Sequence, residues 1–475
     1  MCILESNVKV MISICVIMPE YIISLCLFDN KTNSKTAKVS ESVTYEELLK
    51  IATNKFRTKI LTLLNEDGYL FSNEMLKNEL KIYCSLKKLD GKVYLAIEKK
   101  NVIIKVISID SYISEESVKQ LQLLEKLEGV THIYGMPDLH LGSGCPIGSV
   151  TITDGVIHPH LMGDDIGCGM SFVKTGILLS DITKKKINKL AEIIRLEGQY
   201  NNAIKSDDLV NFCNGKYVTI LNDYAKHMGT IGAGNHFAEL QVVEKIYDND
   251  LAQKYDINTN EFYLTVHSGS RGLGEHILTL FQNKEINIDE YKDLHNYTLL
   301  WATHNRSNIA NRFLQFITPI PTTNEFKCIA DMSHNYYEEM IHEGKNIIIH
   351  RKGAAPCYNN PIIIPGSRGA RTYIVFPIKS DLDHGFSVSH GAGRKITRKK
   401  AYVLMSEIES SDRKKKLEND NTISNIVLCE DQHMFYEEAP FAYKDIDIVV
   451  NDLVSLGLVK IIVSMVPVIT YKHRV

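Results

Sequence analysis

The sequence lacks a cysteine framework, an apolar run of membrane length and an excess of charge of either sign. Its ten cysteines include no CxxC pair, and 475 residues can bury a core without disulfides. We therefore expect reduced thiols in a cytosolic protein, with a nuclear location also open. The apolar run from Val10 to Met18, continued to Phe28, is broken by Pro19-Glu20, and neither part reaches the roughly 18 residues of a membrane span.

The formal net charge of −3 excludes a strongly basic field over the whole chain. A nucleic-acid partner would have to be held by a local basic face. The sequence also contains no P-loop motif and no evident internal repeat, which argues against a Walker-type nucleotide site and a repeat fold.

The length exceeds that of one ordinary domain, and residues 1–100 have the pattern of a separate module. Strands are expected near residues 21–30 and 35–40, then a helix from Thr44 to Phe56 with Thr44 as N-cap, then further strands. This order predicts a β-grasp-like module, similar to ubiquitin or doublecortin domains, suited to binding a protein. A linker at residues 98–101 would separate it from a catalytic domain spanning residues 101–475.

One motif in this module has two interpretations. Lys88-Leu-Asp-Gly91 matches the KxDG motif of lysine-type nucleotidyltransferases. Asp-Gly between alternating strands is also a preferred hairpin turn, and no companion motif accompanies it. We favour the turn.

Beyond the linker, the sequence changes character. Ser114 is expected to cap a helix carrying Val118, Leu121, Leu124 and Leu127 on one face. From Gly135 to about Arg394, runs of glycine, histidine, aspartate and asparagine then interrupt short apolar strands. The pattern predicts an α+β fold with its chemistry on loops at strand ends.

The segment from Gly163 to Met170 predicts a mixed-ligand metal site. Asp165 and Cys168 are three residues apart, and the glycines around them let the backbone turn so that both side chains converge. A carboxylate suits hard cations, and a thiolate suits softer transition metals. The alternative is a buried cysteine in a tight turn.

Three further histidines lie in similarly polar settings. His236 follows a glycine-rich loop, His267 ends an apolar strand at residues 262–266, and His334 lies in Asp331-Met-Ser-His-Asn335. Imidazole is a common metal ligand, although any one of these histidines alone would more often be structural. Together with Asp165 and Cys168, they favour a metal centre.

His390 has the surroundings of a nucleophile directed at phosphorus. It precedes Gly391-Ala-Gly393, and the cations Arg394, Lys395, Arg398, Lys399 and Lys400 follow. An accessible imidazole beside phosphate-neutralising cations suits covalent phosphoryl or nucleotidyl transfer. The alternative is a solvated helix start with surface lysines.

From residue 105 to 475 the chain resembles the RtcB family of RNA ligases, through the ordered motifs MPDLHLG, GDDIGCGM, GTIGAGNHFAE, HSGSRGLG, SHN, HRKGA, IPGSRGA, SHGAGR and EEAPFAYKDID. The resemblance implies a distinctive α+β catalytic fold. It implies two manganese ions at Asp165, Cys168, His236, His267 and His334. It implies that His390 takes GMP from GTP. It also implies guanylate contacts at Asn235, His236, Phe237, Ala238, Glu239, His334, Asn335, Asn360, Pro361, Ile362, Ile363, Ser367, His390, Gly391, Ala392, Gly393, Tyr443 and Lys472.

The implied reaction opens a 2′,3′-cyclic phosphate where present, activates the RNA 3′-phosphate with GMP and joins it to a 5′-hydroxyl end, in RNA repair or tRNA splicing. RNA ends and an archease-like activator are the implied partners. A metal-dependent phosphoesterase using the same ligands, or a binding protein with a decayed enzyme, are the alternatives. Complete metal ligands argue against decay, and labelling by GTP would separate the other two.

The chain also departs from the family pattern at several positions. His160 and Asp164 replace small or apolar residues, which resembles the branch that accompanies a release-factor-like protein. Arg368 replaces a frequent methionine, and the expected terminal Lys-Gly is here Lys472-His-Arg-Val.

Overall fold

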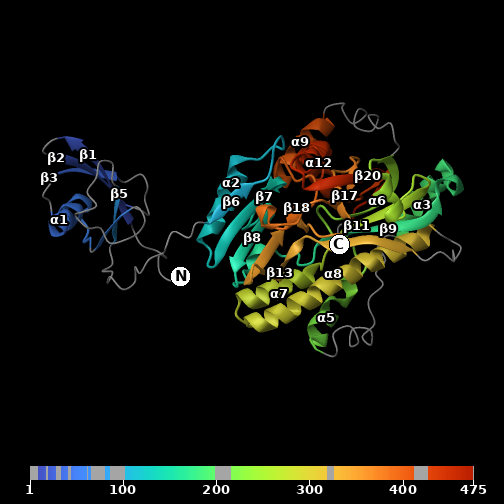
Figure 1. Ribbon diagram of the computed structural model, residues 1–475, viewed down its shortest axis with the longest axis horizontal. Coiled ribbons are helices and arrows are strands. Elements are labelled where there is room, and N and C mark those ends of the chain that lie inside the picture. The colour runs from blue at the N-terminus through green and yellow to red at the C-terminus, as the bar shows by residue number, and fades with distance from the viewer. Residues whose placement is uncertain are drawn as a thin grey trace. The chain divides into compact units, whose positions relative to one another are not determined.

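The structure is a computed structural model that describes residues 9–17, 20–27, 34–40, 44–60, 62–65, 81–85, 102–197, 216–317, 326–410 and 426–473. The chain divides into two compact units, Met1–Asn101 and Val102–Val475. Each unit is described by itself (Figure 1).

Among its described residues, the first unit contains one helix and a five-stranded sheet of order β3-β2-β1-β5-β4, with every neighbouring pair antiparallel. Its elements are β1 (Lys9–Ile17), β2 (Glu20–Leu27), β3 (Ser34–Ser40), α1 (Tyr45–Phe56), β4 (Thr62–Asn65) and β5 (Lys81–Ser85). The predicted helix is confirmed. Thr44 and Glu47 form a capping box in which the Glu47 amide donates to Thr44 Oγ1 at 3.3 Å.

The apolar run at residue 10 forms β1, an extra strand ahead of the predicted order. The β-grasp identity is not confirmed. The Lys88-Leu-Asp-Gly91 motif and the linker at residues 98–101 lie outside the described residues.

The second unit combines helices with three sheets, which confirms the mixed class predicted for it. Its strands are β6 (Ile103–Val106), β7 (Val130–His140), β8 (Ile147–Asp154), β9 (Gly169–Leu178), β10 (Phe237–Ile246), β11 (Glu261–Ser268), β12 (Lys327–Ser333), β13 (Asn335–His342), β14 (Lys345–Lys352), β15 (Ala354–Pro356), β16 (Ile362–Pro365), β17 (Thr372–Pro377), β18 (Ser387–Ser389), β19 (Ile426–Leu428) and β20 (Val459–Tyr471). Its α-helices are α2 (Glu115–Gln122), α3 (Lys184–Glu197), α5 (Val218–Tyr224), α6 (Asn249–Lys254), α7 (Gly272–Gln282), α8 (Ile288–Ile317), α9 (Arg398–Ser410), α11 (Gln432–Glu437) and α12 (Ile446–Ser455).

The largest sheet has the order β12-β9-β11-β10-β20-β17-β16, and β19 pairs with β20 in parallel. A second sheet has the order β13-β14-β8-β7-β6, and β15 pairs with β18. Because β9 and β10 run antiparallel to β11 and β12, the starts of the first two meet the ends of the last two. The ends of these four strands thus meet at one edge of the sheet, and the end of β20 joins them because Tyr471 pairs with Ala238.

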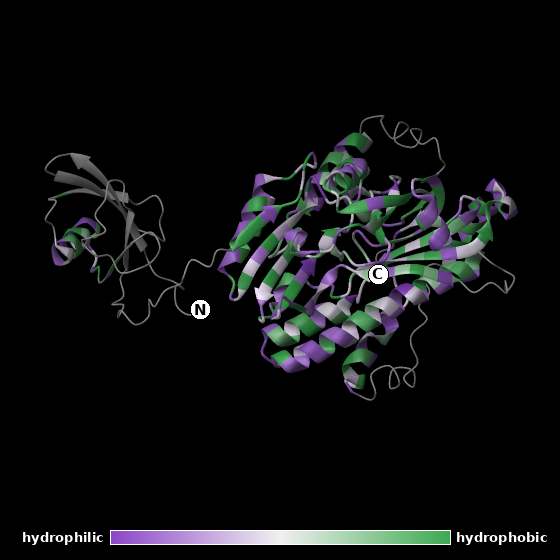
Figure 2. Ribbon diagram, in the orientation of Figure 1, coloured by the Kyte–Doolittle hydropathy of each residue, from purple (hydrophilic) through white to green (hydrophobic). Residues whose placement is uncertain are grey.

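Helices cover both faces of the largest sheet, as apolar faces of a sheet require. On one side Ile309, Phe313 and Leu314 of α8 pack with Leu264 and Val266 of β11. On the other side α12 packs against β20 through a cluster of buried aliphatic side chains. Figure 2 shows apolar residues alternating with polar ones along the strands and on helices such as α8.

Two local predictions in this unit are confirmed. Ser114 caps α2 by accepting a hydrogen bond from the Ser117 amide at 3.2 Å, and Leu121 and Leu124 are buried. The helix ends earlier than the apolar pattern suggested, because residues 123–126 tighten into a 3₁₀ turn. Of the helices in the described ranges, none has both the length and the apolar character needed to cross a membrane.

Candidate active site

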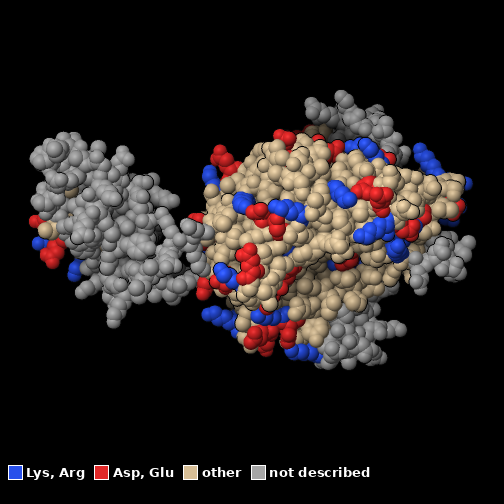
Figure 3. Space-filling view, viewed as in Figure 1, with Lys and Arg blue, Asp and Glu red and all other residues tan. Residues whose placement is uncertain are grey.

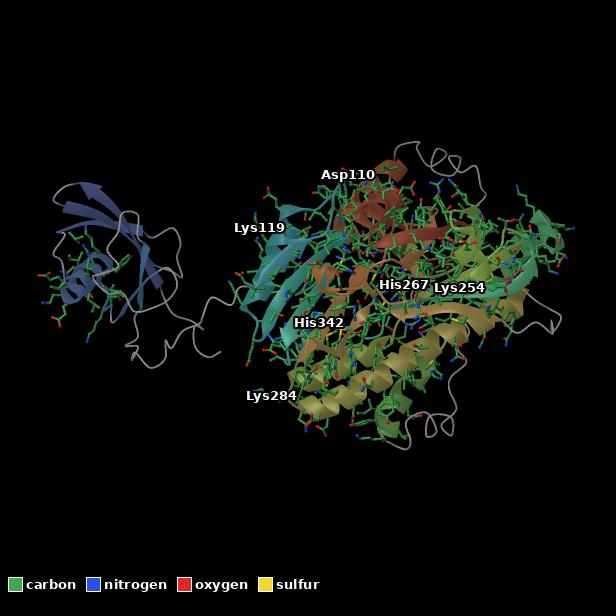
Figure 4. The ribbon with its side chains drawn as sticks, in the orientation of Figure 1. Asp110, Lys119, Lys254, His267, Lys284 and His342 are labelled. Carbon is green, nitrogen blue, oxygen red and sulfur yellow. The ribbon has the colours of Figure 1, made fainter. Side chains whose placement is uncertain are left out.

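Five predicted metal ligands converge at the edge where the strand ends meet. Cys168 immediately precedes β9, His236 immediately precedes β10, and His334 joins β12 to β13. His267 lies in β11 opposite Phe237, and Figure 4 shows it in the interior of the unit, whereas Lys119 and Lys284 lie at the outside. Antiparallel pairing thus brings together residues that are far apart in the sequence.

The ligand atoms form two overlapping groups that share Cys168. One group is Cys168, His267 and His334, and the other is Asp165, Cys168 and His236, with the donor atoms of each group within 4.8 Å of one another. The Cys168 Sγ lies 3.3 Å from the Nε2 atoms of both His236 and His267, and His236 Nε2 lies 3.1 Å from Asp165 Oδ2. A shared thiolate between two groups suits a pair of neighbouring ions.

The turn before β9 depends on glycine. Gly167 has a φ of +76°, and it precedes Cys168 at the point where the chain enters the strand. Gly269 lies so close to Asp165 that an added Cβ would meet the carboxylate oxygen at 2.2 Å. These positions explain why the ligand motifs are glycine-rich.

The five side chains of these two groups form the ligand cluster, and the electrostatics of this cluster fit a bound cation. Burial lowers the pKa values of His267 and His334 well below the usual range, which keeps both rings in the neutral form that binds metals. Burial and the Asp165 carboxylate raise the pKa of the Cys168 thiol well above its usual value. The buried Nδ1 atoms of His236 and His334 have no hydrogen-bond partner among the described residues. A divalent ion would favour the thiolate and release its proton.

A buried arginine holds this turn in place. Arg306 of α8 is fully buried and binds Asp331 through Nε at 2.8 Å and Nη2 at 2.6 Å. Its Nη1 donates to the carbonyl oxygens of Gly167 at 2.8 Å and Ser268 at 3.2 Å. The helix thereby connects the two strand ends that carry Cys168 and His267.

His390 lies beside the cluster and has a different partner. It follows β18, and its ring centroid is 4.6 Å from that of His334. Its Nδ1 lies 2.7 Å from Oδ2 of Asp138, a fully buried carboxylate that also accepts the His390 amide at 3.1 Å. Burial opposes ionisation of Asp138, but the hydrogen bond from His390 and the positive charge of Lys444 lower its pKa.

This pairing sets the tautomer of His390. An ionised carboxylate accepts, so Nδ1 carries the proton and Nε2 keeps its lone pair. Lys444 supports the strand around Asp138, because its Nζ donates to the carbonyl oxygens of Pro137 at 2.9 Å and Leu139 at 2.7 Å. Burial lowers the pKa of Lys444 to about 8.

A cavity of about 610 Å³ opens at His390. The buried part of its lining, called the inner end here, includes Phe237, Glu239, Thr470 and Lys472. Glu239 is buried and accepts hydrogen bonds from Gln241 Nε2 at 2.7 Å and from Thr470 Oγ1, while Lys472 Nζ donates to the His236 carbonyl oxygen at 3.0 Å. Burial raises the pKa of Glu239 to about 7 and lowers that of Lys472. The volume and the few placed polar groups are typical of a small-molecule site.

Glu438 fixes three other side chains of the cavity lining. It is almost fully buried and accepts from Arg394 Nη1 at 3.1 Å, from Arg398 Nε at 3.3 Å and from the Tyr443 hydroxyl. Two guanidinium groups and an aromatic ring are thus fixed on one carboxylate, and all three line the cavity.

Comparison with known proteins shows which family the chain belongs to. The family model described as tRNA-splicing ligase RtcB matches residues 120–208, 201–291 and 278–473, which is more than half of the chain. The chain belongs to the RtcB family.

Individual RtcB proteins are similar over most of their length. RNA-splicing ligase RtcB2 of Escherichia coli is 31% identical over 389 residues, covering 78% of this chain and 96% of that protein. The tRNA-splicing ligase RtcB of Nanoarchaeum equitans is 29% identical over 467 residues, covering 79% and 96%. RNA-splicing ligase RtcB homolog 1 of Entamoeba dispar is 26% identical over 529 residues, covering 93% and 95%. Since residues 102–475 are about 79% of 475, the similarity to this last protein extends into the first unit.

Ten of the residues that the RtcB resemblance assigns to guanylate line the cavity: Asn235, Phe237, Glu239, Ser367, His390, Gly391, Ala392, Gly393, Tyr443 and Lys472. His236 and His334 lie in the ligand cluster instead. The Asn335 amide turns away, donating to the Asp165 carbonyl at 3.2 Å and accepting from the Gly353 amide at 2.8 Å. Ala238 is buried in the core.

Residues 360–363 do not line the cavity. Asn360 is exposed, and Ile362 and Ile363 are buried in the core at the start of β16. The chain reaches the cavity only at the end of this strand, through Pro365, Gly366, Ser367 and Arg368. Arg368 packs 3.8 Å from the centroid of the Phe435 ring and donates to the Phe435 carbonyl at 3.1 Å.

Sequence reasoning missed Asp138, Glu438 and Arg306. The first two lie inside motifs that were recognised, MPDLHLG and EEAPFAYKDID. For Asp138 the available signal was a carboxylate in a mainly apolar segment, whereas Glu438 lies among other charged residues. Arg306 gave no local signal, because an arginine in a long helix is ordinarily a surface residue.

Proposed function

We propose that the protein is a GTP- and manganese-dependent RNA ligase that joins RNA 3′-phosphate or 2′,3′-cyclic phosphate ends to 5′-hydroxyl ends through a guanylylated His390. The observation that carries this proposal is the pairing of His390 with Asp138 beside the ligand cluster and at the cavity. Membership of a family whose described members are RNA-splicing ligases supports the reaction class.

In the first step His390 Nε2 attacks the α-phosphorus of GTP. A P–N bond forms, and the bond from that phosphorus to the bridging oxygen breaks, releasing pyrophosphate. The ring becomes cationic, and the Asp138 carboxylate stabilises it through the Nδ1 proton. No proton has to leave Nε2, because the tautomer already leaves it free.

The inner end of the cavity suits guanine. A carboxylate at Glu239 can accept from the N1–H and the exocyclic amino group of guanine, and Lys472 can donate to O6. Adenine offers the opposite arrangement of donors and acceptors on that edge. Phe237 and Tyr443 supply apolar and aromatic surface for the base.

The later steps need phosphate oxygens held near His390. The RNA 3′-phosphate attacks the phosphorus of the guanylylated histidine, the P–N bond breaks, and the imidazole is regenerated. The 5′-hydroxyl oxygen then attacks the RNA phosphorus, its proton is lost and GMP leaves. Arg394 and Arg398, fixed by Glu438, can neutralise these phosphates.

The ligand cluster fits manganese. Bound at Asp165, Cys168, His236, His267 and His334, two such ions would gather phosphate charge and assist the leaving group. The carboxylate suits manganese, and the imidazoles and the thiolate would also admit softer ions such as zinc or cobalt.

Incubation with GTP labelled at the α-phosphate and manganese tests the proposal. We expect covalent label on the wild-type protein, located by mass spectrometry at His390, and none on His390→Ala. The His390→Ala variant should still bind manganese, because this residue is in neither ligand group. Hydrolysis of phosphoesters without any covalent label would instead support the phosphoesterase, and label at Lys88 would show that KxDG is the functional motif.

A further inference from the structure

The mouth of the cavity differs in character from its inner end. The exposed part of the cavity lining, called the mouth here, includes Tyr112 and Leu141, which are 57% and 46% exposed. Lys395 and Lys399 line the same mouth and are also exposed. None of these four side chains is among the residues that the RtcB resemblance assigns to guanylate.

Tyr112 is held on a fixed loop. The Asp452 carboxylate of α12 accepts hydrogen bonds from the amides of residues 109, 110 and 111, at 2.9, 2.9 and 3.0 Å, and from Ser108 Oγ at 3.1 Å. On the other side Ser114 caps α2. Tyr112 lies between these two anchored points, so its ring is presented to solvent from a backbone that is already ordered.

Within the described part of the chain, the positive charges of the two lysines have no carboxylate partner. Arg394 and Arg398 are both paired with Glu438. Lys395 and Lys399 have no carboxylate within salt-bridge distance among the described residues, although the Lys395 amide is anchored to the Ala442 carbonyl at 2.8 Å. Figure 3 shows cations and anions interspersed over the face in view. Cations that have no carboxylate partner attract an anionic chain.

We propose that this mouth is a binding site for the terminal nucleotides of single-stranded RNA, in which Tyr112 stacks on a base and Lys395 and Lys399 contact backbone phosphates. Aromatic rings beside cations are the usual means of holding single strands without regard to sequence. The inference rests on the proposed function, since the RNA end must reach His390 through this opening.

Binding of a short fluorescent RNA that ends in a 3′-phosphate, measured by anisotropy without GTP, tests the site. We expect Tyr112→Ala to weaken binding about tenfold or more, since stacking of a base on an aromatic ring has that size of effect. Tyr112→Phe should restore binding, because it keeps the ring. Tyr247→Ala is the matched control, because Tyr247 is a 43% exposed tyrosine outside the cavity lining.

The lysines are tested through salt dependence. Each phosphate contact to a single strand contributes about 0.7 to the slope of log affinity against log salt. Lys395→Ala/Lys399→Ala should therefore reduce the slope by about 1.4, and Lys184→Ala/Lys185→Ala on α3 should leave it near the wild-type value. The control pair removes the same charge from exposed positions outside the cavity lining.

Equal binding by wild type, Tyr112→Ala and the Lys395/Lys399 double variant, with an unchanged salt slope, would overturn this inference and leave the ligase proposal intact. Equal losses in the control variants would also overturn it. Failure of the ligase proposal would appear differently, as wild-type protein that takes no label from GTP. Thermal unfolding midpoints within a few degrees of wild type keep loss of binding separate from loss of folding.

Discussion

Two neighbouring regions of the second unit are built on buried imidazoles and differ in what the ring nitrogens face. In the ligand cluster, His236 and His267 both direct Nε2 towards the Cys168 sulfur. In the other region, His390 directs Nδ1 to Asp138. The ring centroids of His334 and His390 are only 4.6 Å apart, so the partner atom rather than the location distinguishes the proposed metal ligand from the proposed nucleophile.

The largest effect is expected where the two regions depend on one atom. Cys168→Ala removes a side chain shared by both ligand groups, so bound manganese, guanylylation and joining should all be lost. The loss of metal affinity should exceed the roughly 10- to 100-fold cost of removing an outer-shell partner. Metal content by atomic spectroscopy and label from GTP measure the two effects.

Cys145→Ala is the matched control for Cys168→Ala. Cys145 is also buried and lies in neither ligand group. We expect this variant to bind manganese and accept label like the wild type. Near-normal guanylylation of Cys168→Ala at moderate manganese would contradict the assignment of the shared ligand.

A change at Asp138 should impair the function of the His390 region and leave metal binding by the ligand cluster unchanged. In Asp138→Asn the side-chain amide can donate to His390 Nδ1, which moves the ring proton to Nε2 and blocks attack. We expect guanylylation to slow by about 10²- to 10⁴-fold, as for a comparable tautomer change in a catalytic triad. Manganese content should stay normal. A variant that loses manganese in parallel would show that the His390 region and the ligand cluster are not independent.

A smaller effect should arise at the inner end of the cavity from the titration of Glu239. Its pKa is about 7 because of burial, so the carboxylate that would accept from guanine becomes protonated as the pH falls through 7. The KM for GTP in guanylylation should therefore rise about tenfold for each pH unit below 7 and level off above it.

The variant Glu239→Gln provides the control for this pH dependence. It keeps the size of the side chain but cannot titrate, so its KM should be higher overall and nearly flat between pH 6 and 8. A pH profile unchanged by this substitution would assign the dependence to another group, such as Lys444, whose pKa is about 8.

The difference between the two regions also decided what the sequence could reveal. Glycine-rich motifs with a thiol, a carboxylate and histidines pointed to the ligand cluster, and the antiparallel sheet brings all five residues together. Asp138 could not be assigned a role, because its contact with His390 joins residues 252 positions apart. Contacts between distant segments depend on topology, which local patterns do not specify.

The predicted guanylate contacts at residues 360–363 rest on the family resemblance and stay a prediction. Ile362 and Ile363 are buried in the core at the start of β16. Pro365 to Arg368, at the end of the strand, are the residues that the fold presents to the cavity.

The smallest effect on chemistry is expected from removing the first unit. All residues of the ligand cluster, the His390–Asp138 pair and the cavity lining belong to residues 102–475. The core of the second unit also begins at once, since Val102 and Ile104 pack against buried side chains such as Leu121 and Ile133. A chain starting at Val102 should fold and join model RNA ends within about twofold of the full-length rate. A cut further along would remove β6, the edge strand of its sheet, and would leave β7 as an exposed edge.

We propose that the first unit binds a protein partner. The truncated chain should therefore lose this binding. The five-stranded sheet of the first unit offers an edge and faces of the kind that bind other proteins. Ligation rates on one short RNA pair, with unfolding midpoints and manganese content for both chains, make the comparison. A soluble, metal-loaded truncated chain that cannot ligate would show that the first unit contributes to the active enzyme. The chemistry would then not be confined to the two imidazole regions, and the boundary after Asn101 would not separate functions.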